Sequence, residues 1–282
     1  MTASQGSITA STLAFASALA MTSDDALTRD WPAPSPPGGF WYGYEDNARE
    51  VTFRIYQQLR DLATEIEITR TPATEAQHIL AQHQFAYRDL TGALAGVRDD
   101  EFDRAPDEKE WPLRTVLYHI GLTERGFHAL IHWAVARRRA GDTLPIEMPD
   151  DHRDAVSDPI VESGTLGEVL QRFDALHQRV LNDFTNLDST DLDAPNVWWE
   201  GYEIPARFRL HRFDAHLREH TIQVDKTLAG IDHPPSEPQR LARLIHRALG
   251  QVEGCLLGAP DTCMDQQQSI AESIAAAMTG LQ

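Results

Sequence analysis

The chain has 282 residues and a formal net charge of -18 at pH 7, which argues against nucleic acid or an anionic membrane as its surface partner. With 41% hydrophobic and 24% charged residues it has the composition of a globular protein with a sizeable core. No stretch reaches the roughly 20 consecutive apolar residues that a membrane span needs. Only two cysteines occur, Cys255 and Cys263, which excludes a disulfide framework and predicts a reduced, cytoplasmic protein.

The first 39 residues predict a disordered tail and linker. The apolar run "STLAFASALA" (Ser11 to Ala20) is similar to a signal peptide, but neither Lys nor Arg precedes it. Translation beginning at Met21 would remove the run. The segment "WPAPSPPGG" (Trp31 to Gly39) is rich in proline and glycine, as linkers are. An aromatic cluster follows, which predicts an anchor packed onto the domain or, alternatively, a partner-binding patch: Phe40, Trp41, Tyr42 and Tyr44.

Beyond residue 40, apolar residues recur with helical spacing, and Pro or Gly ends most runs. Helices are predicted over residues 46–69, 73–97, 112–139, 165–187, 205–230 and 237–257. A long loop rich in Pro and Asp is predicted at 143–163, and residues 259–282 predict a partly helical tail. Neither a repeat nor strand alternation is present. The predicted fold class is an all-α bundle with antiparallel neighbouring helices.

The phase of the histidines on these helices separates candidate ligands from surface residues. At about 100° per residue, His216 and His220 border the apolar stripe of the 205–230 helix. His119 borders the stripe of the 112–139 helix in the same way. Three imidazoles on one edge of the bundle indicate either an open divalent metal site or polar residues satisfied at a helix interface.

The remaining histidines on these two helices fall outside that edge. His128 and His132 are phased about 180° and 220° from His119 and are predicted to be surface residues. His211 lies about 180° from His220 and is excluded as a ligand.

Two segments carry a resemblance to a known family. "EWPLRTVLYHI" (Glu110 to Ile120) resembles the Trp-Ser-x-x-x-Val-Leu-x-His-Leu segment of the DinB/YfiT-like superfamily, with Pro112 where Ser is usual. "HRFDAHLREHTIQVDKTLAGI" (His211 to Ile231) resembles its closing helix, with HxxxH and a following Gln. The resemblance covers roughly residues 73–230. The predicted domain is therefore 40–258, a DinB-like four-helix bundle with an extra N-terminal helix and a C-terminal helical extension.

The resemblance implies a divalent metal, with zinc or nickel expected first and iron or cobalt as alternatives, bound at the positions of His119, His216 and His220. It also implies candidate activities. Thiol S-transferases that use bacillithiol or mycothiol belong to the superfamily, as does the mycothiol-dependent maleylpyruvate isomerase. Iron-dependent sulfoxide synthases need a second catalytic domain for which this chain has no room.

Other residues on the 205–230 helix suggest the surroundings of the metal. Arg209 and Arg212 fall within about 40° of the ligand face and are predicted either to bind a substrate carboxylate or to pair with acidic residues of a neighbouring helix. Gln223 is predicted to orient a ligand or a bound water. Glu219 points away from the ligand face in phase but lies close enough to it to be a rim residue, and it is assigned no role. Trp198, Trp199 and Tyr202 are candidates for a pocket wall, with core or lid packing as the alternative.

The sequence leaves three function classes open. The first is a transferase or isomerase that acts on a small molecule with a low-molecular-weight thiol bound as thiolate at the metal. The others are a non-catalytic metal-binding bundle with a stress or regulatory role, and a hydrolase that uses metal-bound hydroxide. No catalytic residue is singled out, and the oligomeric state stays open, a homodimer being one option.

Overall fold

The computed structural model describes residues 7–31, 47–142, 144, 146–197 and 201–281, and these residues are mainly helical. The contacts among these residues divide the chain into two compact units. Unit 1 comprises Met1–Pro72, Gln84–Val97 and Pro234–Gln282, and unit 2 comprises Ala73–His83 and Arg98–His233. In the described part of the chain, no helix combines the length and hydropathy that crossing a membrane requires.

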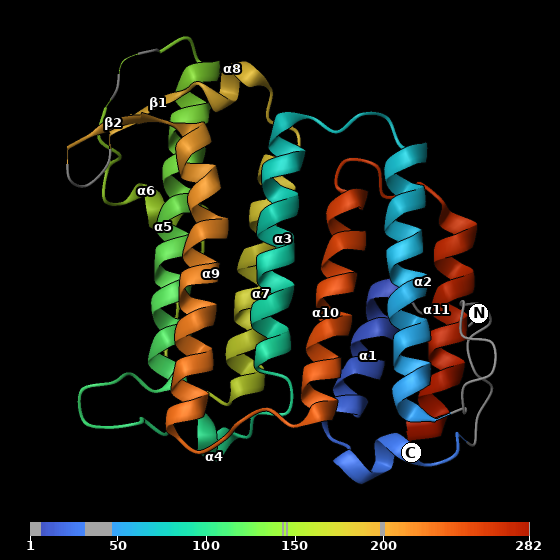
Figure 1. Ribbon diagram of the computed structural model, residues 1–282. Coiled ribbons are helices and arrows are strands. Elements are labelled where there is room, and N and C mark those ends of the chain that lie inside the picture. The colour runs from blue at the N-terminus through green and yellow to red at the C-terminus, as the bar shows by residue number, and fades with distance from the viewer. Residues whose placement is uncertain (1–6, 32–46, 143, 145, 198–200, 282) are drawn as a thin grey trace, which may run out of the picture. The chain divides into compact units, whose positions relative to one another are not determined.

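Unit 2 is a helical bundle (Figure 1). Its elements in chain order are the first part of α3 (Glu75–Ala93), α4 (Asp99–Phe102), α5 (Leu113–Arg139), α6 (His152–Val156), α7 (Leu166–Phe184), α8 (Ser189–Leu192), β1 (Pro195–Val197), β2 (Glu203–Pro205) and α9 (Ala206–Gly230). The predicted all-α class and four-helix bundle are therefore confirmed, with α3, α5, α7 and α9 as the four long helices.

Aromatic and histidine rings join the four long helices of unit 2. Phe213 of α9 contacts Phe127 of α5, with ring centroids 5.4 Å apart, and His83 of α3, at 5.0 Å. His83 in turn lies 4.5 Å from the ring of His177 on α7. Burial of the two phenylalanine side chains contributes about 1.5–3 kcal/mol each to folding, so they are a major part of the bundle core.

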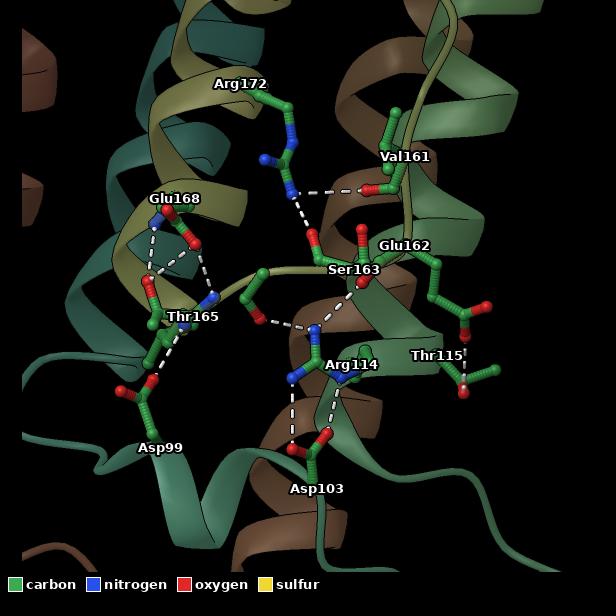
Figure 2. Close-up of polar contacts among 12 residues, drawn as sticks. Asp99, Asp103, Arg114, Thr115, Val161, Glu162, Ser163, Thr165, Glu168 and Arg172 are labelled. Carbon is green, nitrogen blue, oxygen red and sulfur yellow. Dashed lines mark hydrogen bonds and ion pairs between the residues drawn. The ribbon is translucent and has the colours of Figure 1, made fainter.

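Arg114, near the start of α5, forms several hydrogen bonds to the segment that precedes α7 (Figure 2). Arg114 donates hydrogen bonds to the carbonyl oxygens of Glu162 and Gly164 and to the carboxylate of Asp103. Gly164 has a φ of +115°, a conformation that L side chains rarely adopt, and this turn leads into α7. Thr165 then caps α7 by accepting a hydrogen bond from a backbone N–H of the first turn. These contacts fix the end of the bundle at which α5 begins.

Unit 1 contains the remaining helices. They are α1 (Ile8–Ala20), η1 (Asp24–Thr28), α2 (Ala48–Thr69), the last part of α3, α10 (Glu237–Leu256), α11 (Met264–Met278) and η2 (Thr279–Leu281). The apolar faces of α1, α2, α10 and α11 form one core, in which Phe15, Ile55 and Ile245 are fully buried. Ion pairs attach α3 to α10: the largely buried Arg88 contacts Glu253 at 2.6 Å, and the half-buried Asp89 accepts hydrogen bonds from Arg243 and Arg247.

The disordered tail predicted over residues 1–39 is wrong for the described part of that range. Residues Ile8–Ala20 form α1, whose N-terminus is capped by the side chain of Ser7. Phe15 and Leu19 are fully buried in the core of unit 1. Residues 32–39 of the predicted linker and the aromatic cluster at 40–44 lie outside the described residues.

The ends of the predicted domain also differ from the structure. Residues 259–282 were predicted as a partly helical tail, whereas α11 is a helix whose Ile274 is fully buried in unit 1. The continuous domain predicted over 40–258 is divided, because α2 and α10 pack with α1 and α11 in unit 1. Within the predicted loop 143–163 lies the short helix α6, and β1 and β2 form an antiparallel pair.

Candidate metal centre

Three histidines from two helices of unit 2 meet at one point. His119 comes from α5, and His216 and His220 come from successive turns of α9. One ring nitrogen of each lies within 4.8 Å of the others, and Nε2 of His119 is 3.4 Å from Nε2 of His216. Two nitrogens that bind one zinc ion at tetrahedral angles lie about 3.3 Å apart, so the spacing of these donors fits a bound divalent ion.

The packing of α5 and α9 places these rings. His119 lies early in α5 and meets late residues of α9, whereas Phe127, two turns further along α5, meets the earlier Phe213. The two helices are therefore antiparallel (Figure 1). The ring of Phe127 contacts the edge of His216 at 5.8 Å, and the ring of Trp111 lies 5.5 Å from His119. Two aromatic rings thus hold the imidazoles in place.

The surroundings keep two of the imidazoles neutral. Burial lowers the pKa of His216 to about 3, and the positive charges of His220, His119 and Arg212 contribute to the shift. Burial also lowers the pKa of His119, as does the charge of His220, while Glu219 acts in the opposite direction. Only a neutral imidazole has a lone pair for a metal, so these shifts favour ligation at neutral pH.

Gln223 contacts one of the three rings. Its Oε1 lies 2.8 Å from Nδ1 of His220. Because an amide oxygen only accepts hydrogen bonds, Nδ1 is the donor in this contact, and in the neutral tautomer that donates from Nδ1 the Nε2 atom has a lone pair for a metal. This contact gives the orienting role predicted for Gln223 a structural basis.

The three imidazoles form part of the wall of a cavity of about 480 Å³. The other lining residues are two arginines, one carboxylate and small or apolar side chains: Leu122, Thr123, Gly126, Phe127, Arg153, Arg212 and Glu219. A space of this size accommodates a small organic molecule beside the histidines.

The two arginines predicted at the site occupy different environments. Arg212 lines the cavity and is half-buried. Arg209 is fully buried, with its guanidinium 5.9 Å from the ring centroid of Phe127, and is not among the lining residues. The structure therefore brings Arg212 to the cavity with the histidines and leaves Arg209 in the bundle interior.

Arg153 lines the cavity and was not identified from the sequence. It lies on α6, which is held against α5 by the buried Arg125. Arg125 donates to Oδ1 of Asp154 at 2.6 Å and to the hydroxyl and carbonyl oxygens of Ser157. The sequence held no signal for Arg153, because α6 is a single short turn within a segment rich in Pro and Asp.

Glu219 also lines the cavity, in the rim position that its phase allowed, although the sequence assigned it no role. It lies between the two α9 ligands in sequence, and its negative charge partly opposes the lowering of the pKa of His119 by burial. The carboxylate is mounted on a long flexible side chain at an exposed position, so it reaches the rim although its Cα lies off the ligand face.

His128 was predicted on the surface, and the structure corrects this. The side chain is fully buried, and Nε2 lies 2.7 Å from the carboxylate of Asp183 on α7. The reason is that α5 packs against several elements at once, so more than one of its faces is buried. Trp198 and Trp199, predicted as pocket walls, lie outside the described residues. Tyr202, predicted with them, is exposed and does not line the cavity, so neither the pocket wall nor the core packing is found for it.

Comparison with known proteins places the chain in a family. A solved structure of YfiT from Bacillus subtilis, described as a probable metal-dependent hydrolase with an unusual four-helix bundle topology, matches at 11% identity and a TM-score of 0.40. The match covers 72% of this chain and 97% of YfiT, and likeness at this level transfers no activity. No curated protein matches the chain. The sequence profile of the DinB superfamily matches residues 82–224, half of the chain, and the protein belongs to that superfamily.

Proposed function

We propose that the protein is a divalent-metal-dependent transferase or isomerase that acts on a small anionic substrate together with a low-molecular-weight thiol. The observation that carries the proposal is the shared cavity: His119, His216 and His220 form one part of its wall, and two arginines form another. Three protein ligands leave at least one coordination position for an incoming group, as in catalytic sites. Zinc or nickel is the expected metal, with iron as the alternative.

The residues that line the cavity have three different roles in this proposal. His119, His216 and His220 hold the divalent ion, which lowers the pKa of a thiol bound to it and so supplies a nucleophile at neutral pH. Arg212 and Arg153 bind an anionic group of the substrate, a task suited to planar guanidinium groups. The ring of Phe127 provides an apolar wall that keeps water from part of the site.

The thiol comes from outside the chain in this proposal. Cys255 and Cys263 are the only cysteines of the sequence, and neither lines the cavity. Burial raises the pKa of the Cys255 thiol, which makes it a poor nucleophile. Bacillithiol and mycothiol, the thiols that the family resemblance implies, are therefore the co-substrates to test first.

Glu219 supports a second candidate, a hydrolase. A hydrolase needs a carboxylate that takes a proton from a metal-activated water, and Glu219 is the carboxylate in the cavity lining. In this version the same arginines bind the substrate and no thiol is required. The two candidates therefore differ in their dependence on thiol and on Glu219.

The test is an activity screen of the metal-loaded full-length chain with bacillithiol, mycothiol and a generic electrophile. We expect turnover that requires both metal and thiol, that His216→Ala abolishes and that the exposed His211→Ala on the same helix retains. Hydrolysis of ester substrates without thiol, lost at least 100-fold in Glu219→Gln, would instead establish the hydrolase. Absence of both activities at full metal occupancy would contradict the enzyme proposal and favour a non-catalytic metal-binding bundle.

A further inference from the structure

A second group of potential metal ligands lies inside the bundle of unit 2. His83 of α3, Glu124 of α5 and His177 of α7 each offer one ligand atom, and these atoms lie within 4.8 Å of one another. All three side chains are fully buried. None of them lines the cavity of the three-histidine site.

Two residues of this cluster, Glu124 and His83, have unsatisfied polar atoms to a degree that is rare in protein interiors. Both carboxylate oxygens of Glu124 and both ring nitrogens of His83 are buried without a hydrogen-bond partner. More than about 90% of buried polar groups in proteins have such a partner. An unpaired buried carboxylate costs several kcal/mol when ionised, so a structure that retains one needs a compensating group.

A proton shared between these residues does not account for the arrangement. A protonated Glu124 that donated to an imidazole would place an oxygen within hydrogen-bond distance of a ring nitrogen, and the structure contains no such contact for Glu124 or His83. Burial alone raises the pKa of Glu124 and lowers the pKa of His83 to about 3, so two neutral groups would lie side by side without a bond. A cation bound by the three residues gives the Glu124 carboxylate and one ring nitrogen of His83 a partner.

We propose that His83, Glu124 and His177 bind a second divalent transition-metal ion, enclosed in the bundle core. Two imidazoles and one carboxylate are a donor set that suits zinc and iron(II). The ion neutralises the buried carboxylate and cross-links three of the four long helices, α3, α5 and α7, because each of them contributes one ligand. Its role is structural, because the three donors are shielded from solvent and none of them faces the substrate cavity.

The two metal positions are separated by aromatic rings. Phe127 contacts His216 of the first site at 5.8 Å and Phe213 at 5.4 Å, and Phe213 contacts His83 of the second at 5.0 Å. No ligand is shared. The inference is therefore independent of the proposed function, and removal of one ion leaves the donors of the other in place.

The experiment measures zinc bound by the full-length chain after refolding in excess Zn²⁺ and dialysis. Refolding is required because a fully enclosed site fills as the chain folds. We expect two equivalents in the wild type, one in the His216→Ala/His220→Ala double variant, and none when Glu124→Gln is added. Loaded with Co²⁺ instead, the double variant should show the visible absorption of a low-coordinate nitrogen and oxygen site.

The control variant is His128→Gln, a substitution of an equally buried histidine on the same helix that is bonded to Asp183. It should retain the metal content of its parent. If Glu124→Gln does not fold, as judged by circular dichroism, His83→Gln removes a ligand from a different helix. Equal zinc content in Glu124→Gln and its parent, or no zinc in the folded double variant, would overturn the second site.

Thermal unfolding gives an independent readout. Zinc should raise the unfolding temperature of the His216→Ala/His220→Ala double variant, because an ion that binds only the folded state stabilises it. Glu124→Gln should remove this increase. A zinc-induced increase that survives Glu124→Gln would contradict the proposed site.

Discussion

Arg212 and Arg209 lie on the same face of α9, and their positions along the helix axis decide which of them reaches the cavity. Arg212 precedes His216 by one turn, about 6 Å along the axis, and lines the cavity. Arg209 precedes it by about 10 Å and is buried against Phe127. The angular position around the helix axis is similar for the two residues and does not separate them, because it contains no information on the distance along the axis.

Arg212→Gln should raise the KM for an anionic substrate about tenfold or more, because a hydrogen bond to a charged group contributes about 1.5–3 kcal/mol and 1.4 kcal/mol corresponds to a factor of ten. Metal content should stay at the wild-type value. Steady-state kinetics together with metal analysis measure both.

The matched control for this change is Arg218→Gln. Arg218 lies on the same helix, pairs with Asp214 at 2.7 Å and does not line the cavity. An unchanged KM in Arg212→Gln, or an equal increase in Arg218→Gln, would remove Arg212 from the substrate site.

The sequence predicted the residues whose position depends on helix periodicity alone. His119, His216 and His220 border the apolar stripes of two strongly periodic helices, and the structure brings them together. His128 was misplaced, because the burial of several faces of α5 is not encoded in the phase of one helix.

At the scale of elements, α1 shows what the apolar pattern of a buried helix looks like. Its buried residues recur at helical spacing: Ile8, Ser11, Thr12, Phe15, Ala16, Leu19 and Ala20. Several of them are small or hydroxylated, so the pattern is weak when read as hydrophobicity. The segment is also apolar on most sides, which is typical of a helix enclosed by others and equally of a signal peptide.

Phe15→Ala tests the structural importance of α1. Loss of a fully buried phenylalanine should lower the free energy of unfolding by about 3–5 kcal/mol, because it removes apolar burial and leaves a cavity. Ser17→Ala, at an exposed position of the same helix, should change it by less than about 0.5 kcal/mol. Urea denaturation followed by circular dichroism measures both, and equal stability of the two variants would show that α1 does not belong to the core.

The long helices α2, α3, α5, α7, α9 and α10 were predicted within a few residues of their observed ends. The short elements α4, α6, α8, β1 and β2 were not, because three to five residues carry too little periodicity to predict a structure. This difference matters for the site, since Arg153 is contributed by α6.

At the scale of the whole molecule, the order of elements along the chain does not match the division into units. Residues at both ends of the sequence and the last part of α3 build unit 1, while the middle of the chain builds unit 2. A sequence pattern shows which face of each helix is apolar but not which distant helix covers it. The single continuous domain predicted for residues 40–258 failed for that reason.

Unit 2 contains every residue assigned to the candidate metal centre and to the enclosed second site. The DinB superfamily match, residues 82–224, covers most of the same part of the chain. The chemistry proposed for the protein therefore belongs to unit 2. Unit 1 contributes no residue to either ligand set.

The central claim is that His119, His216 and His220 bind a divalent metal, and metal analysis of the purified full-length His216→Ala variant tests it most directly. In equilibrium dialysis against a series of Zn²⁺ concentrations, we expect the variant to bind zinc at this site about tenfold or more weakly than the wild type. His211→Ala, an exposed position on the same helix, should match the wild type. Retention of the full wild-type zinc content in His216→Ala at every concentration of the series would contradict the account.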